Sequence, residues 1–165
     1  MHNLLKVPGI VTAIAFAALA PRAVAQETSF KLICQEVGGA GEPEPAGDRE
    51  GHVISVDNYS CRMEGGPMDG AVVTGNDVTD WDKADGVLLL GNAVVRKPGG
   101  FAAYQDTEGK VALTIADGKV TGATGVGKVH WVVATGGAAP LAGKTFSYTF
   151  KATGPGQWEA NATSE

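Results

Sequence analysis

Glycine is spread along almost the whole chain, and this distribution limits the fold more than any other feature. The 165 residues include 24 glycines, and a glycine inside a helix costs about 1 kcal/mol relative to alanine. An amphipathic helix needs apolar residues at spacings of three and four over roughly ten or more positions. The glycines leave few windows of that length, so the chain is predicted to consist of strands and turns.

Short apolar or alternating segments follow one another from residue 29 onward, each bounded by Gly, Asp, Asn or Pro. In TFSYTFKAT at 145–153, the aromatic residues share one face and the polar residues share the other, which is the period of a strand. Comparable segments occupy 29–37, 52–63, 71–81, 86–97, 101–125 and 126–136. This spacing predicts an all-β fold, a small antiparallel barrel of about eight strands with little helix.

Three glycines in one strand, Gly122, Gly125 and Gly127, favour a barrel over a sandwich, because glycine relieves crowding where a strand bends or two backbones approach. From Gly127 the same face continues through Val129, Trp131 and Val133, and small residues that give way to bulky ones suit a barrel interior. The strings TEGK at 107–110 and ADGK at 116–119 are both predicted to be tight turns.

The string AAPLAGKT at 138–145 has the spacing of a loose phosphate-binding loop. Such a loop needs a helix after its lysine, so that the first amides of the helix face the phosphates. The alternation after Lys144 predicts a strand instead, and Pro140 lacks an amide hydrogen. We therefore expect a connection between two strands and no nucleotide site.

Residues 1–25 have the form of a secretory signal peptide. Lys6 precedes the apolar run GIVTAIAFAALA, and Ala23-Val24-Ala25 supplies small residues before a cut ahead of Gln26. We expect a single mature domain at 26–165, periplasmic or secreted, with no membrane span and with a Pro/Gly/acid-rich loop at 38–51.

Charge and cysteine content agree with export. Residues 1–25 hold two basic and no acidic residues, so the formal charge of −5 for the whole chain becomes −7 for 26–165. An acidic balance argues against nucleic acid or an anionic membrane as a partner. Both cysteines, Cys34 and Cys61, lie in the mature part, and an even number in an oxidising compartment predicts a disulfide.

The C-terminal part of the chain resembles a known group of barrels. The sequence GATGVGKVHWVVATGGAAPLAGKTFSYTFKATG at 122–154 joins a Gly-rich strand, a loop and an aromatic strand. It resembles the C-terminal half of allene oxide cyclase and dirigent-type proteins, and the resemblance implies an eight-stranded antiparallel barrel. No residue matches the polar pocket of the cyclase, so the resemblance assigns no catalytic residue.

The candidate site residues are aromatic side chains and one histidine. Tyr104, Trp131 and Tyr148 are expected to fill the core or line a pocket, and His130 joins them if its face of the strand is the inner one. Asp80 and Asp82 resemble the opening of a calcium loop, but Ala84 stands at the third ligand position. We therefore expect a solvated turn there, without a metal or other cofactor.

These features lead to a function hypothesis with two alternatives. We expect an exported barrel that binds a small apolar or aromatic molecule and has no catalytic activity, since no Gly-x-Ser-x-Gly string is present and both cysteines are expected to be oxidised. One alternative is an isomerase-like enzyme of the cyclase barrel type. The other is a structural or interaction protein of the cell envelope with a filled barrel, forming a homo-oligomer.

Overall fold

The computed structural model describes residues 28–38 and 43–165, and the predicted signal peptide lies outside these residues. The described residues form nine strands and one short 3₁₀ helix. These elements are β1 Ser29–Glu36, β2 Glu44–Pro45, β3 His52–Glu64, β4 Val72–Asp82, β5 Asp85–Lys97, β6 Gly100–Ala116, β7 Lys119–Gly136, η1 Ala139–Leu141, β8 Thr145–Gly154 and β9 Gln157–Ser164.

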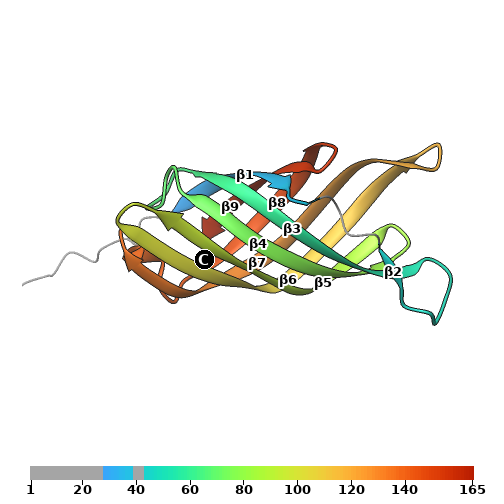
Figure 1. The fold of residues 1–165 in the computed structure, drawn as a ribbon, viewed down its shortest axis with the longest axis horizontal. Coiled ribbons are helices and arrows are strands. Elements are labelled where there is room, and N and C mark those ends of the chain that lie inside the picture. The colour runs from blue at the N-terminus through green and yellow to red at the C-terminus, as the bar shows by residue number, and fades with distance from the viewer. Residues whose placement is uncertain (1–27, 39–42) are drawn as a thin grey trace, which may run out of the picture.

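Eight antiparallel strands close into a barrel, which confirms the predicted fold class (Figure 1). From β3 to β9, each strand pairs with the next one along the chain. β1 lies between the two ends of this series, with Lys31 opposite Glu64 of β3 on one side and Asn161 of β9 on the other. Of the described strands, only the two-residue β2, which pairs with β3, lies outside the barrel.

The β6–β7 hairpin differs from the sequence prediction at one of its two predicted turns. ADGK does turn the chain, with Asp117 and Gly118 at φ values of 51° and 72°, as a two-residue hairpin turn requires. TEGK was predicted to be a turn, and this is wrong, because it lies inside the continuous strand β6. A register shift between Asp106 and Glu108 places an extra residue there, so the local turn signal produces a β-bulge.

The segment that resembled a phosphate loop joins β7 to β8. Its middle is η1, with Pro140 in the first turn, and the strand β8 begins at Thr145. The predicted strand after Lys144 is therefore confirmed. Leu141 turns inward and is almost completely buried, so this connection closes one end of the barrel.

Strand β7 places Val129 and Trp131 inside the barrel, and both are buried. Val133 was predicted to share this face, and this is wrong, because its side chain is 44% exposed. A register shift opposite Ala103 and Tyr104 leaves Val132 without a partner in β6, so the alternation is displaced by one residue beyond Trp131.

The barrel is densely packed at one end only. This closed end is formed by the connections 65–71, 98–99 and 137–144, and its interior is filled by fully buried side chains of Met63, Met68, Val73, Val95, Trp131, Leu141 and Phe146. The rings of Phe30, Trp131 and Phe146 pack edge-on or tilted against one another. The opposite end, formed by the turns 83–84, 117–118 and 155–156 and by residues 37–38 and 43–51, is the open end (Figure 1).

Several glycines in the barrel wall stand beside a large inward side chain of a neighbouring strand. Gly75 lies under the Tyr59 ring, Gly86 under Trp81, and Gly125 under Phe150. A Cβ atom at any of these positions would overlap the ring beside it. The glycines thus give large side chains room to lean across the wall. The crowding predicted for Gly122, Gly125 and Gly127 is confirmed at Gly125 and Gly127, but it is wrong at Gly122, where a Cβ would meet no atom nearer than 3.8 Å.

Cys34 of β1 and Cys61 of β3 form the predicted disulfide. The two residues are directly opposite in the pairing of these strands, and both are buried. The bond fixes β1, the strand at which the barrel closes, to β3.

Replacing a wall glycine should be costly only where a ring covers it. Gly125→Ala should lower the free energy of unfolding by about 1 to 3 kcal/mol, because the new methyl group would overlap Phe150 and the backbone of Lys110. Gly122→Ala in the same strand is the matched control, since its nearest neighbour would be 3.8 Å away. Urea denaturation of both variants measures the difference, and equal midpoints would contradict this explanation.

Removing the disulfide should destabilise the barrel. The bond closes a separation of 27 residues, which corresponds to about 3 to 4 kcal/mol on the chain-entropy model. A variant with Cys34→Ala and Cys61→Ala should unfold at lower urea, and reduction of the unaltered protein should shift its midpoint similarly. Reductant should leave the double variant unchanged. An unshifted midpoint on reduction would argue against a stabilising role for the bond.

Candidate functional site

A cavity of about 640 Å³ occupies the half of the barrel toward the open end. It reaches Val120 beside the β6–β7 turn and Pro155 in the β8–β9 turn, both at that end. Its inner limit is set by Phe30, Tyr104 and Val129, which belong to the buried core. The barrel is thus packed at one end and hollow at the other.

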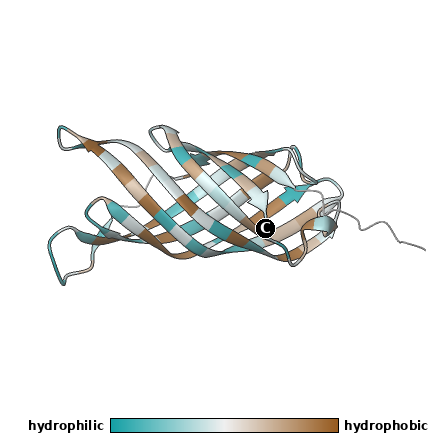
Figure 2. Cartoon of the chain, turned by 180° about the vertical axis from the view of Figure 1, so that it is seen from behind, coloured by the Kyte–Doolittle hydropathy of each residue, from teal (hydrophilic) through white to brown (hydrophobic). Residues whose placement is uncertain are grey.

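Most of the cavity wall is apolar. The rings of Trp81, Phe150 and Trp158 line it together with Leu88, Val111 and Leu113. Leu88 leans over Gly109 of β6 in the same way that the rings lean over other wall glycines. Along the strands in Figure 2, apolar and polar residues alternate, as expected when one face of each strand is turned inward.

Three aspartates form a row across the inner wall. Asp57 of β3 pairs with Asp77 of β4, and Asp77 pairs with Gly91 of β5. Asp106 of β6 follows in the row, because a Cβ on Gly91 would meet Asp106 Oδ2 at 2.5 Å and Asp77 Oδ1 at 2.9 Å. All three aspartates line the cavity, and the missing side chain of Gly91 leaves room for two of them to converge.

The hydrogen bonds of these aspartates are unevenly distributed. The Tyr148 hydroxyl donates to Asp106 Oδ1 at 2.9 Å. The Ser55 hydroxyl donates to Asp57 Oδ2 at 3.0 Å and in turn accepts from the Trp81 indole at 3.0 Å. Asp77 Oδ1 is buried and has no hydrogen-bond partner among the described residues, which is uncommon for a buried carboxyl oxygen.

Burial raises the pKa values of two of the aspartates. The pKa of Asp77 is raised to about 8, chiefly by loss of water and further by the neighbouring charges of Asp106 and Asp57. The pKa of Asp106 is raised to about 6 by burial, against the opposing effect of the Tyr148 hydrogen bond. At pH 7 Asp77 therefore holds a proton while most Asp106 carboxyls are ionised.

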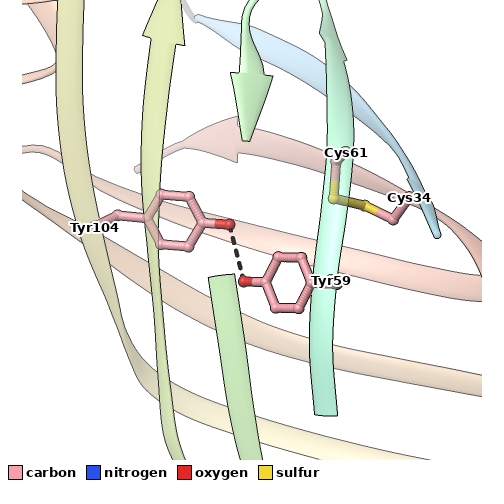
Figure 3. The surroundings of a disulfide bond; sticks show 4 residues. All are labelled: Cys34, Tyr59, Cys61 and Tyr104. Carbon is pink, nitrogen blue, oxygen red and sulfur yellow. Dashed lines mark hydrogen bonds between the residues drawn. A yellow bond between two sulfur atoms is a disulfide. The ribbon is translucent and has the colours of Figure 1, made fainter. Parts of the chain in front are cut away.

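Two tyrosines lie at the inner end of the cavity. The hydroxyl groups of Tyr59 and Tyr104 point toward each other across the barrel at 3.3 Å, near the Cys34–Cys61 bond (Figure 3). Both rings are buried, and burial raises the pKa of each hydroxyl. The Tyr59 ring also packs edge-on against Trp158 at 5.7 Å between ring centres. The inner end of the cavity is thus aromatic, with neutral hydroxyl groups.

Of the four residues that the sequence suggested for ligand contact, the structure places two in the cavity lining and two elsewhere. Tyr104 and Tyr148 line the cavity. Trp131 is completely buried in the closed-end core and does not reach the cavity. His130 lies on the opposite face of β7 from Trp131, is half-buried, and contacts Thr145 Oγ1 at 3.3 Å.

Asp80 and Asp82, the weak metal candidates, are engaged elsewhere. Asp80 Oδ1 lies 2.6 Å from His52 Nε2, and Asp82 Oδ2 accepts from Arg49 at 3.1 Å. His52 also contacts Asp48, and these two carboxylates raise its pKa. Within residues 28–38 and 43–165, no group of three His, Cys, Asp or Glu side chains is arranged to hold a metal ion.

Sequence analysis missed Asp57, Asp77 and Asp106, although a signal was present for two of them. Asp57 stands two and four residues before Tyr59 and Cys61, and Asp106 stands two residues after Tyr104. Alternation places Asp106 on the same face as Tyr104, which was expected inside the barrel, and Asp57 on the same face as Cys61, which was expected to form the disulfide. Asp77 lacked such a signal, because it lies in the acidic stretch NDVTDWDKADG at 76–86, which was predicted to be a solvated turn. This prediction is wrong for most of the stretch, because β4 continues to Asp82 and only residues 83–84 turn the chain.

Comparison of the sequence with descriptions of known protein families and with curated proteins gives no match. The resemblance to allene oxide cyclase and dirigent-type barrels therefore stays a prediction. In the part of the chain that the structure describes, no helix is long and apolar enough to cross a membrane.

The raised pKa of Asp77 predicts a stability that depends on pH. Between about pH 4 and pH 8 the unfolded chain ionises Asp77 while the folded barrel keeps the proton, so this group makes the fold less stable as pH rises through that window. Asp77→Asn removes the effect. Relative to the unaltered protein, it should be about equally stable near pH 4 and about 1 to 3 kcal/mol more stable at pH 8 to 9.

Urea denaturation at a series of pH values measures this difference. Asp117→Asn, in the exposed β6–β7 turn, is the control and should show no such trend. A constant difference between Asp77→Asn and the unaltered protein across the series would refute the assignment of a buried, protonated Asp77.

Proposed function

We propose that the protein is an exported carrier or receptor that binds a small, mainly apolar molecule inside the barrel and does not transform it. The observation that carries this proposal is the cavity of about 640 Å³, which lies within the usual range of small-molecule sites. An eight-stranded barrel can be filled by its own side chains, and at the closed end this one is. The cavity at the open end therefore exists because the inward side chains there do not fill the barrel, and not because an eight-stranded barrel is too wide to be filled.

The cavity wall fits such a ligand. Trp81, Phe150 and Trp158 offer flat apolar surfaces, and Leu88, Val111 and Leu113 complete an apolar ring. The aspartate row with its tyrosine neighbours forms one group of polar side chains in the lining, which also includes Glu36, Thr79, Thr121 and Gln157. A predominantly apolar pocket with a small group of convergent polar side chains is typical of ligand-binding proteins. The structural alternative, a barrel filled throughout, is less well supported because half of this barrel is hollow.

One observation favours an enzyme as the second candidate function. Asp77 and Asp106 converge inside the cavity with pKa values raised to about 8 and about 6, and such neighbouring carboxyl groups are suited to donate and accept protons near neutral pH. An isomerase-like activity on a bound molecule would use them in this way. Binding without catalysis is the preferred function, because it requires only the cavity, whereas an enzyme also requires a reaction that the two carboxyl groups can catalyse.

Export to an oxidising compartment completes the proposal. It is supported by the form of residues 1–25 and by the Cys34–Cys61 disulfide, since such bonds persist mainly outside the cytosol. An exported carrier would meet its ligand directly in that compartment.

Filling the cavity should abolish binding. In Leu88→Trp the larger ring would project into the cavity that Leu88 lines, whereas in Leu89→Trp it would project from the outer wall, where Leu89 is 58% exposed. Titration with a fluorescent apolar probe should show saturable binding to the unaltered protein and to Leu89→Trp, and at least tenfold weaker binding to Leu88→Trp. Equal binding by both variants would place the probe outside the barrel.

Gentle purification from the native host, followed by mass spectrometry, identifies the natural ligand class. A retained molecule with a mainly apolar skeleton is the expected result. Recovery of empty protein from several growth conditions, together with absence of probe binding, would overturn the proposal.

A further inference from the structure

We infer that the molecule bound in the barrel carries a basic nitrogen, such as an amine or a guanidine, which is held between Asp77 and Asp106 while its apolar part extends toward the open end. This inference rests on the proposed function and adds the chemical class of the ligand. It is carried by the convergence of two carboxyl groups inside a mainly apolar cavity into which no cationic side chain of the described residues points.

The two carboxyl groups face one small region of the wall. Asp77 Oδ1 and Asp106 Oδ2 both come within 3 Å of the point where a Gly91 side chain would begin. Asp106 uses its other oxygen to accept from Tyr148, and Asp77 Oδ1 is buried without any hydrogen-bond partner among the described residues. Acceptor capacity therefore remains unused at this point, and a protonated nitrogen has the hydrogens to fill it.

No cationic side chain of the described residues neutralises this pair. The ion pairs of the described lysines, arginines and histidines involve other carboxylates, all toward the outer surface. Lys110 borders the cavity, but its partners in β5 and β7, Val87 and Val126, are exposed on the outer wall. Side chains of paired residues point to the same side of a sheet, so the Lys110 ammonium group points outward.

Aromatic rings around the carboxyl groups favour the same class of ligand. Tyr59, Tyr104 and Trp81 all line the cavity near the aspartate row. The faces of such rings attract a cation within about 6 Å, and the attraction is stronger where water is excluded. A carboxylate ligand would meet the like charge of Asp106 beside it, and that of Asp77 once this group loses its proton, so the same geometry disfavours fatty acids.

The pH dependence of binding should have a definite sign. A cation favours the ionised carboxyl groups, so it must displace the proton that Asp77 holds at neutral pH. Because the pKa values of Asp106 and Asp77 are raised to about 6 and about 8, binding should tighten as pH rises from 5 to 8. The other acidic groups of the cavity act in the same direction, because Asp57 adds to burial in raising the pKa values of Asp77 and Glu36. Alkyl amines stay protonated to about pH 10, so the ligand itself does not titrate in this window.

A matched ligand series tests the inference. Decylamine, decanol and decanoate share one apolar chain and differ only in the head group, and each is titrated below its micelle concentration by competition with the fluorescent probe. For the unaltered protein at pH 8 the amine should bind at least tenfold more tightly than the alcohol, and decanoate should bind most weakly. In the variant with both Asp77→Asn and Asp106→Asn the preference for the amine should fall below about threefold. Asp117→Asn, on the exposed turn, should keep the full preference.

The outcomes distinguish the two proposals. Equal affinity for the amine and the alcohol, or tighter binding of decanoate, would overturn the basic-nitrogen inference while leaving a binding barrel in place. Absence of binding by all three compounds and by the probe would overturn the proposed function itself. If the double variant fails to fold, titrations of the unaltered protein between pH 5 and pH 8 provide the test. The affinity for decylamine relative to decanol should rise at least fivefold over this range, and a smaller rise would refute the inference.

Discussion

Space inside a narrow barrel is the constraint on which the rest of this structure depends. Eight strands enclose an interior just wide enough for side chains, so a large residue can point inward only where its neighbour on the next strand is small. Gly75, Gly86, Gly125 and Gly127 provide that room for Tyr59, Trp81, Phe150 and Tyr148. At the closed end the inward residues fill the interior; toward the open end, rings lying flat over glycines line the wall and leave the centre hollow. The cavity is thus a consequence of where glycine is placed.

The aspartate row lowers the stability of the folded barrel, because a carboxyl group loses its hydration when it is buried. Gly91 makes the arrangement sterically possible, and Tyr148 satisfies only part of it. The densely packed closed end and the disulfide supply stability that the open half lacks. A stable, densely packed region beside a less stable site is expected where a protein keeps buried polar groups for binding or chemistry.

Much of the fold could be predicted from the sequence, and the site only in part. Glycine content and alternation were sufficient for an antiparallel barrel and for the strand after Lys144, and the even number of cysteines in a chain expected to be exported was sufficient for the Cys34–Cys61 bond. They failed at TEGK and at Val133 because both depend on β-bulges, which arise from pairing with a partner strand and have no clear local signal. The site required the register of four strands, since Asp57, Asp77, Gly91 and Asp106 are far apart in the sequence and meet only when the strands pair. Tyr104 and Tyr148 could be predicted as lining residues because a large aromatic side chain on the inward face of a barrel strand must either fill the core or line a cavity.

The position of β1 has a consequence for how the chain acquires its structure. β1 pairs with β3, which follows it closely, and also with β9, so that Lys31 meets both Glu64 and Asn161. The first pairing is available early and can be locked by oxidation, whereas the second must wait for every intervening hairpin. Contacts between distant parts of a sequence slow folding, because much chain entropy is lost before they form. Sealing of the β1–β9 seam is therefore the natural rate-limiting event, and until it happens β1 and β9 each present an open edge on which a chaperone, or another unfinished copy, can add a strand.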